Sequence, residues 1–128
     1  MSLLQVNSVS KRFGGLTANQ DVSFTVDKAQ VVGLIGPNGA GKTTMFNCVA
    51  GFYVPTTGSI LLNGRNIAGL PPEACARAGV GRTFQVARTF TSMTACENVM
   101  TGALLRQHNV AKARATAMEW LGLSLIHI

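Results

Sequence analysis

A glycine-rich stretch that ends in a lysine and two threonines holds the residue types best suited to chemistry. Residues 36–43 fit G-x-x-x-x-G-K-[ST], the phosphate-binding P-loop pattern. Glycines permit backbone conformations that a Cβ forbids, so successive N–H groups can turn inward around a phosphate. Lys42 supplies charge for the β- and γ-phosphates of a nucleotide, and the Thr43 hydroxyl can ligate a bridging Mg²⁺. The alternative is a glycine-rich turn with a helix cap and a solvated lysine.

Such a loop needs a strand before it and a helix after it. Residues 31–35 are an apolar run without polar alternation, which predicts a central strand buried on both faces. Residues 44–50 predict a helix that ends at Gly51 as its C′ residue. The start of this helix would add partial positive charge and unpaired amide donors to the loop.

The flanking sequence predicts a small antiparallel β layer. Residues 3–9 and 21–26 read as two early strands, and the second alternates cleanly between apolar and polar residues. Asn63-Gly64 lies between two further strand-like segments and predicts a type I′ hairpin. The apolar positions expected on one face of the second strand are Val22, Phe24 and Val26.

Further along, the pattern becomes helical. Residues 71–79 predict a short helix with prolines at its start and glycine past its end, and residues 80–85 predict a second strand of the main sheet. Thr94 and Glu97 form a capping box, and another helix is expected from about Val110. The apolar stripes expected on these two helices are Val99, Met100, Ala103 and Leu104, then Val110, Ala113, Ala117 and Trp120/Leu121.

Composition limits the class of protein. A chain of 128 residues with 47% hydrophobic residues is at most one small domain with enough apolar sequence for a core. The apolar runs are strand-sized, no secretory signal is visible, and three cysteines without ligand spacing indicate reduced thiols in the cytosol. Net charge is +6, but the basic residues are scattered without interleaved aromatics, so we expect no nucleic-acid partner.

Several segments together resemble the ATP-binding subunit of an ABC transporter, and more narrowly that of a branched-chain amino acid importer. The resemblance runs from about Leu3 to Leu121. It implies an α/β fold with an ABC-type P-loop NTPase core, a small N-terminal antiparallel β layer and the start of a helical subdomain after Gln85. The segments that carry it are residues 11–16, 36–44, 47–48, 51–53, 82–85 and 90–99.

The resemblance also assigns roles. Phe13 matches the aromatic that stacks on adenine, whereas its residue type and position alone favour an ordinary loop aromatic that covers a sheet edge. Gln85 matches the Q-loop glutamine, which approaches Mg²⁺ and the attacking water. Lys42 and Gln85 are thus the implied catalytic residues, and Thr43 and Gln85 the implied metal ligands. The implied nucleotide-binding residues are Phe13, Gly36, Pro37, Asn38, Gly39, Ala40, Gly41, Lys42, Thr43 and Thr44.

Other parts of the family pattern do not occur in this sequence. A signature loop, a Walker B strand ending in aspartate, a catalytic glutamate and a switch histidine are all missing. We therefore expect residues 1–122 to be the N-terminal part of an ABC nucleotide-binding domain, truncated and not catalytically complete. Residues 123–128 match the in-frame translation of a sequencing-library adapter and are expected to be a non-native tail, so His127 has no catalytic role; a genuine apolar tail is the alternative.

The resemblance implies ATP and Mg²⁺ as cofactors and a peripheral position on the cytoplasmic face of the inner (plasma) membrane. It implies a head-to-tail dimer with a second ABC ATPase subunit, multi-pass membrane permease subunits as partners, and indirect work with a periplasmic or extracellular solute-binding protein. One alternative is a soluble ABC ATPase acting in DNA repair or translation. Another is a nucleotide-binding module without enzymatic activity.

Overall fold

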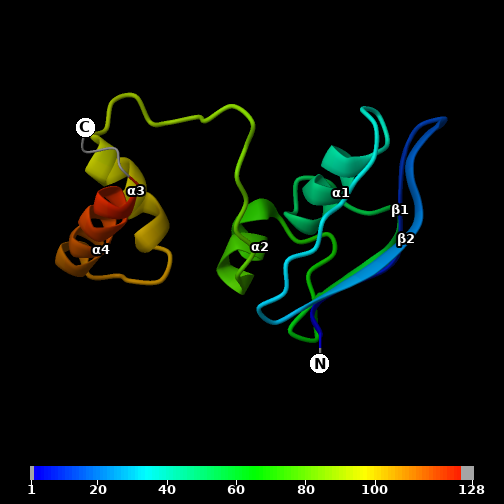
Figure 1. The fold of residues 1–128 in the computed structure, drawn as a ribbon, viewed down its shortest axis with the longest axis horizontal. Helices are drawn as coiled ribbons and strands as arrows, with labels where there is room; N and C mark the ends of the chain where they lie inside the picture. Colours follow the sequence, from blue (N-terminus) through cyan, green and yellow to red (C-terminus); the bar gives the residue numbers. More distant parts are fainter. Residues whose placement is uncertain (1, 125–128) are drawn as a thin grey trace. The chain divides into compact units, whose positions relative to one another are not determined.

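The structure is a computed structural model that describes residues 2–124. The chain forms two compact units, Met1–Arg82 and Thr83–Ile128. The first contains a sheet with helices α1 and α2, and the second contains helices α3 and α4 (Figure 1). The boundary lies shortly before Gln85, after which the resemblance implies that a helical subdomain begins. The fold thus has the antiparallel layer, the helix after the glycine-rich loop and the helical region that the sequence predicts.

The sheet of the first unit is antiparallel and has the strand order β2-β1-β3-β4. Strand β1 (Ser2–Phe13) pairs with β2 (Leu16–Asp27) along most of its length, and both are longer than predicted. Strand β3 (Thr57–Leu62) lies on the other side of β1 and turns through Asn63 and Gly64 into β4 (Arg65–Asn66). Both turn residues have positive φ, 49° and 78°, as a type I′ turn requires. The predicted hairpin is confirmed.

Helix α1 (Lys42–Val49) follows the glycine-rich loop and packs on one face of this sheet. Its end is confirmed, since Ala50 is the C-cap and Gly51 follows with φ +85°. Helix α2 (Pro72–Ala78) begins after Pro71 and ends at Gly79, also as predicted. The core that joins sheet and helices consists of Val6, Val9, Met45, Cys48, Ile60, Ile67 and Cys75.

Two predicted strands are wrong. Residues 31–35 are irregular, and Val31 and Ile35 are 97% and 95% exposed. Residues 80–85 are irregular as well, and the backbone N–H of Val80 donates to the Cys75 carbonyl at the end of α2 (3.0 Å). A strand requires a neighbour for its backbone N–H and C=O groups. The two segments do not pair with each other or with any of the four strands, so their apolar composition alone does not make them strands.

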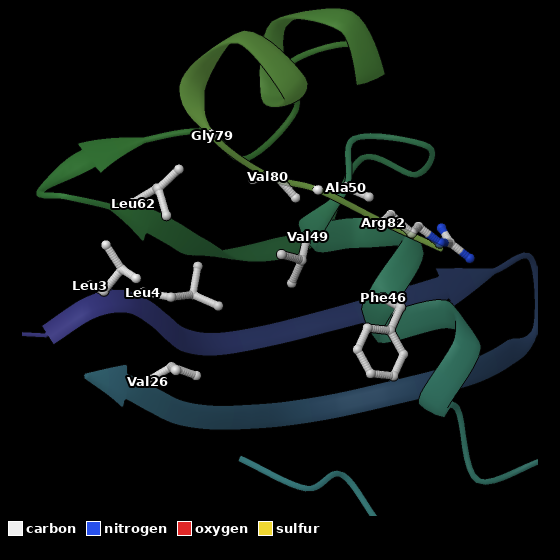
Figure 2. A pocket seen from close by; sticks show the side chains of 11 residues that line it. Leu3, Leu4, Val26, Phe46, Val49, Ala50, Leu62, Gly79, Val80 and Arg82 are labelled. Carbon is white, nitrogen blue, oxygen red and sulfur yellow. The ribbon is translucent and has the colours of Figure 1, made fainter. Parts of the chain in front are cut away.

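An apolar hollow of about 280 Å³ opens on the first unit, between helix α1 and the strands (Figure 2). Side chains from β1, β2 and β3 approach it from one side, and Phe46 and Val49 of α1 approach it from the other (Figure 2). Phe46 is 54% exposed despite its size. The side of α1 that carries Phe46 is therefore only partly covered by the described residues. The hollow is lined mainly by Leu3, Leu4, Val26, Phe46, Val49 and Leu62.

The second unit is a pair of helices. Helix α3 (Ala95–Ala103) starts with the predicted capping box, in which Thr94 accepts from the Glu97 N–H and Glu97 accepts from the Thr94 N–H. Helix α4 (Val110–Leu123) is capped by the Asn109 side chain. The apolar stripe of α3 is confirmed, whereas on α4 only part of the predicted stripe is buried. The small core consists of Met100, Ala113 and Ala117, with Cys96, Val99, Ala103 and Leu104 packed against it.

On α4, Val110 and Trp120 are 59% and 61% exposed, so they do not join the core of the second unit. Of the expected tail, residues 125–128, including His127, lie outside the described residues, whereas Ser124 is the C-cap of α4. Within residues 2–124, no helix combines the length and apolar character needed to cross a lipid bilayer.

Candidate functional site

The glycine-rich loop passes directly into helix α1. Gly41 is the N-cap residue in a left-handed conformation (φ +89°), and Lys42 is the first helical residue. No side chain caps this helix start. The first amides of a helix have no partner within the helix itself, so the donors at this end are available to an anion. Within the loop, the Ala40 N–H donates to the Pro37 carbonyl (3.1 Å) and closes a turn over residues 37–40.

The ammonium of Lys42 reaches back to the start of the same loop. It donates to the carbonyl oxygens of Gly36 and Pro37, the second at 2.6 Å. An anion bound by the loop amides would compete with two neutral carbonyls for this ammonium. A charged oxygen is the stronger acceptor, so the loop and its lysine fit a phosphate group.

The end of the loop lies directly against strand β2. A Cβ built on Gly41 would meet the Ala18 carbonyl oxygen at 2.3 Å, so only glycine fits here without a shift of the backbone. The Asn19 side chain donates from Nδ2 to the Gly41 carbonyl (3.1 Å). By contrast, a Cβ on Gly39, which has φ +86°, would meet nothing within 4 Å. The loop therefore contacts the sheet at Gly41 and has open space around Gly39.

Phe13 ends strand β1 within a small cluster of side chains. Its ring meets that of Tyr53 edge to face, with centroids 5.2 Å apart, and is 40% exposed. The Lys11 ammonium lies 4.9 Å from the centroid of the Phe13 ring and donates to the Val54 carbonyl (2.9 Å). Lys11 of β1 pairs with Asn19 of β2, the residue that contacts Gly41. Phe13 therefore lies two residues further along β1 than the pairing partner of Asn19. The sequence does not reveal this cluster.

Gln85 lies in the second unit, on an irregular and exposed segment. Its role as a Q-loop glutamine therefore stays a prediction. The segment before it is anchored to α1, because Arg82 donates to the Asn47 side chain and its guanidinium lies 5.2 Å from the centroid of the Phe52 ring.

For a metal ion, the start of helix α1 offers the hydroxyl of Thr43, an exposed residue next to Lys42. Among residues 2–124, no group of three or more histidine, cysteine, aspartate or glutamate side chains is placed to hold a metal. A Mg²⁺ at this site would therefore depend mainly on phosphate oxygens and water, with Thr43 as its ligand from the loop.

The three cysteines are free thiols. Burial raises the pKa of Cys48 and of Cys75, and the neighbouring carboxylate of Glu73 raises the pKa of Cys75 further. Both thiols pack in the core of the first unit, which confirms them as core residues. Cys96 is partly exposed on α3.

Comparison with known proteins shows which family the chain resembles. The model of the ABC transporter family matches residues 19–127. The chain is 55% identical over 98 residues to the high-affinity branched-chain amino acid transport ATP-binding protein BraF of Pseudomonas aeruginosa, covering 77% of this chain and 38% of that protein. It is 51% identical over 110 residues to the corresponding protein LivG of Escherichia coli K12, covering 86% and 42%. The chain thus spans less than half the length of these relatives.

Solved structures agree as well. A nucleotide-free ATP-binding cassette from an ABC transporter matches with a TM-score of 0.73 and 31% identity, over 88% of this chain and 45% of that one. A dimeric bacterial ABC transporter cassette has the same fold, with a TM-score of 0.81 at 23% identity over 93% and 56% of the two chains. Because the family model covers most of its residues and the fold is that of an ATP-binding cassette, the chain belongs to the ABC transporter family.

Proposed function

We propose that this chain is the nucleotide-binding, N-terminal part of an ATPase subunit that energises import of branched-chain amino acids. The observation that carries the proposal is the helix start at Gly41 and Lys42, where uncapped amides and an ammonium meet at one loop. The relatives BraF and LivG are named as branched-chain amino acid transport ATP-binding proteins, which supports the solute class.

In this proposal the chain's own residues bind and orient the nucleotide. The amides from Gly39 to Thr44 surround the phosphates. The Lys42 ammonium leaves its two carbonyl acceptors and neutralises charge on the phosphates. Thr43 and Gln85 would hold Mg²⁺, which would supply positive charge to balance that of the phosphates. Phe13 contacts the base.

Catalysis needs groups beyond those described. Phosphoryl transfer depends on positioning and electrostatics, and no carboxylate cluster that could hold a metal is found in residues 2–124. We therefore propose that residues 1–122 supply one part of a composite site and that residues 123–128 contribute nothing to it. The remaining groups would come from further sequence and from a second ABC ATPase subunit paired head to tail.

The partners follow from the same proposal. The subunit would lie at the cytoplasmic face of the membrane against multi-pass permease subunits, and a solute-binding protein would select the amino acid outside. The relatives are named as transport proteins, so they do not favour a soluble ATPase of DNA repair or translation.

Binding of Mg²⁺-ATP by the intact polypeptide tests the site. Replacing Lys42 by alanine removes a charged hydrogen-bond donor, so we expect affinity for a fluorescent ATP analogue to fall by about 10- to 100-fold. Lys112→Ala changes the same charge on helix α4 and should leave affinity unchanged. Equal affinity of the Lys42→Ala variant and the parent protein would reject the assigned site.

Transport needs its own measurement. We expect the polypeptide to co-purify with two multi-pass membrane subunits, and we expect leucine uptake to stop in cells that carry only the Lys42→Ala variant. Normal uptake with that variant, or co-purification with nucleic acid instead, would argue against the importer.

A further inference from the structure

Asn19 is a buried polar residue of strand β2 that bonds to the phosphate loop. Its side chain is only 7% exposed, and its Nδ2 donates to the Gly41 carbonyl at 3.1 Å. The same carbonyl accepts the first hydrogen bond of helix α1, from the Met45 N–H (2.9 Å). One side-chain amide thus contacts the junction between the loop and the helix.

A bulge in β2 turns Asn19 inward. Val9 pairs with Val22 and Lys11 pairs with Asn19, so over this stretch β2 contains one residue more than β1. Asp21, inside the bulge, has φ +47°. Bulges re-aim side chains and are common next to functional sites.

The bulge itself is fixed by a buried hydroxyl. The Asp21 N–H donates to the Oγ of Ser10 (3.0 Å), and Ser10 is 4% exposed. Side chains of a regular strand alternate between its two faces. Because Val22 faces the core, a strand without the bulge would turn Gln20, not Asn19, toward the core.

The amide of Asn19 is only half satisfied. Its Oδ1 is buried and has no hydrogen-bond partner among the described residues. Turning the amide over would bring Oδ1 against the Gly41 carbonyl, so Gly41 dictates the orientation. A buried acceptor without a partner lowers stability, and an apolar side chain of similar size avoids that cost. The contact with the loop therefore explains this asparagine better than the stability of the sheet does.

We propose that Asn19 is a positioning residue of the phosphate-binding loop: its amide holds the Gly41 carbonyl so that the amides at the start of α1 face the phosphates. This inference rests on the proposed function, because it requires that the loop bind a triphosphate. Asn19 acts through the loop and does not contact the nucleotide.

The test replaces Asn19 by leucine, which has a similar size and no polar atoms, in the intact polypeptide. We expect the urea midpoint of unfolding to be equal or higher, because the unpaired oxygen is gone. We expect affinity for inorganic tripolyphosphate and for Mg²⁺-ATP to fall by about fivefold, the size of one lost hydrogen bond. Backbone amide exchange in residues 39–44 should rise, while exchange in strand β1 stays unchanged.

Asn7→Leu is the matched control, since Asn7 donates to Ser59 Oγ (3.4 Å) at an exposed place on the sheet. It should leave affinity unchanged. If the leucine variant does not fold, Asn19→Val carries the test, because valine also removes the amide, is smaller than leucine and leaves less of a cavity than alanine would.

The outcomes separate the two proposals. Failure of the parent protein to bind either triphosphate would reject the proposed function. Binding by the parent protein, with unchanged affinity and amide exchange in the Asn19 variant, would overturn only the role of Asn19. A loss of stability in step with affinity would also overturn it, because Asn19 would then be merely structural.

Discussion

At the scale of single residues, Gly41 has little conformational freedom. Its φ of +89° disfavours any side chain, and the Ala18 carbonyl fills the place of a Cβ. Gly39 has nearly the same φ, +86°, but open space around it. Comparing the same substitution at the two glycines therefore separates the effect of backbone strain from the effect of a close contact.

We expect Gly39→Ala to lower the free energy of unfolding by about 1 kcal/mol, the cost of a left-handed alanine. Gly41→Ala should cost at least about 2 kcal/mol more, because the loop must also move away from β2. Urea unfolding of both variants measures the difference. Equal losses would show that the loop yields to the added methyl group without cost.

The glycine-rich loop could be predicted from sequence because its pattern is local: glycines, lysine and threonines follow one another along the chain. Asn19, Lys11 and Tyr53 could not be found in this way. Asn19 faces inward only because of the bulge at Asp21, and strict alternation would have turned Gln20 inward instead. Phe13 contacts the ring of Tyr53, which lies some forty residues further along the chain.

At the scale of elements, the start of helix α3 depends on the protonation state of one carboxylate. Glu97 accepts the Thr94 N–H at 2.7 Å, and this backbone hydrogen bond, with a second contribution from the Thr94 side chain, lowers the pKa of Glu97. Since its pKa is lowered on folding, the stabilisation is fully present above the ordinary glutamate pKa of about 4.3. It is lost as the pH falls through the lower pKa of the folded protein.

Acid titration monitored by amide exchange in residues 95–103 tests this cap. We expect protection of α3 to fall as the pH drops below about 4, and we expect Glu97→Gln to weaken that pH dependence. Glu119→Gln makes the same chemical change on α4 and should leave the pH dependence of α3 intact. Protection that does not change with pH in the parent protein would show that the charge of Glu97 has no role in α3.

Elements with local signals were predictable, and elements that need distant partners were not. The hairpin at Asn63-Gly64, the capping box at Thr94 and the glycine after α1 each depend on residues close in sequence, and all are confirmed. Residues 31–35 and 80–85 have the composition of buried strands, but a strand also needs a neighbour to pair with. Composition cannot supply one.

At the scale of the whole molecule, we expect the exposed apolar run at residues 31–35 to govern the solubility of the protein. Val31 and Ile35 are almost fully exposed, and an open apolar segment with free backbone groups can pair with another chain. We expect Val31→Lys to reduce light scattering of concentrated solutions, because a charge opposes such pairing.

Val86→Lys is the matched control, because Val86 is 74% exposed in an irregular segment of the second unit. It makes the same substitution outside the apolar run and should change scattering less. An equal reduction by both variants would assign the effect to net charge, not to the run at residues 31–35.

The irregular path of residues 31–35 also bears on how long such a polypeptide survives. Proteases take their substrates as extended, accessible backbone, and surface segments without regular structure are preferred sites of cleavage. A single cut there would divide the chain between strand β2 and the loop that leads into α1. Asn19 and Gly41, which are in contact, would then lie on separate fragments. In a cell, the lifetime of the chain on its own would then be limited by the five residues whose composition is most typical of a protein interior.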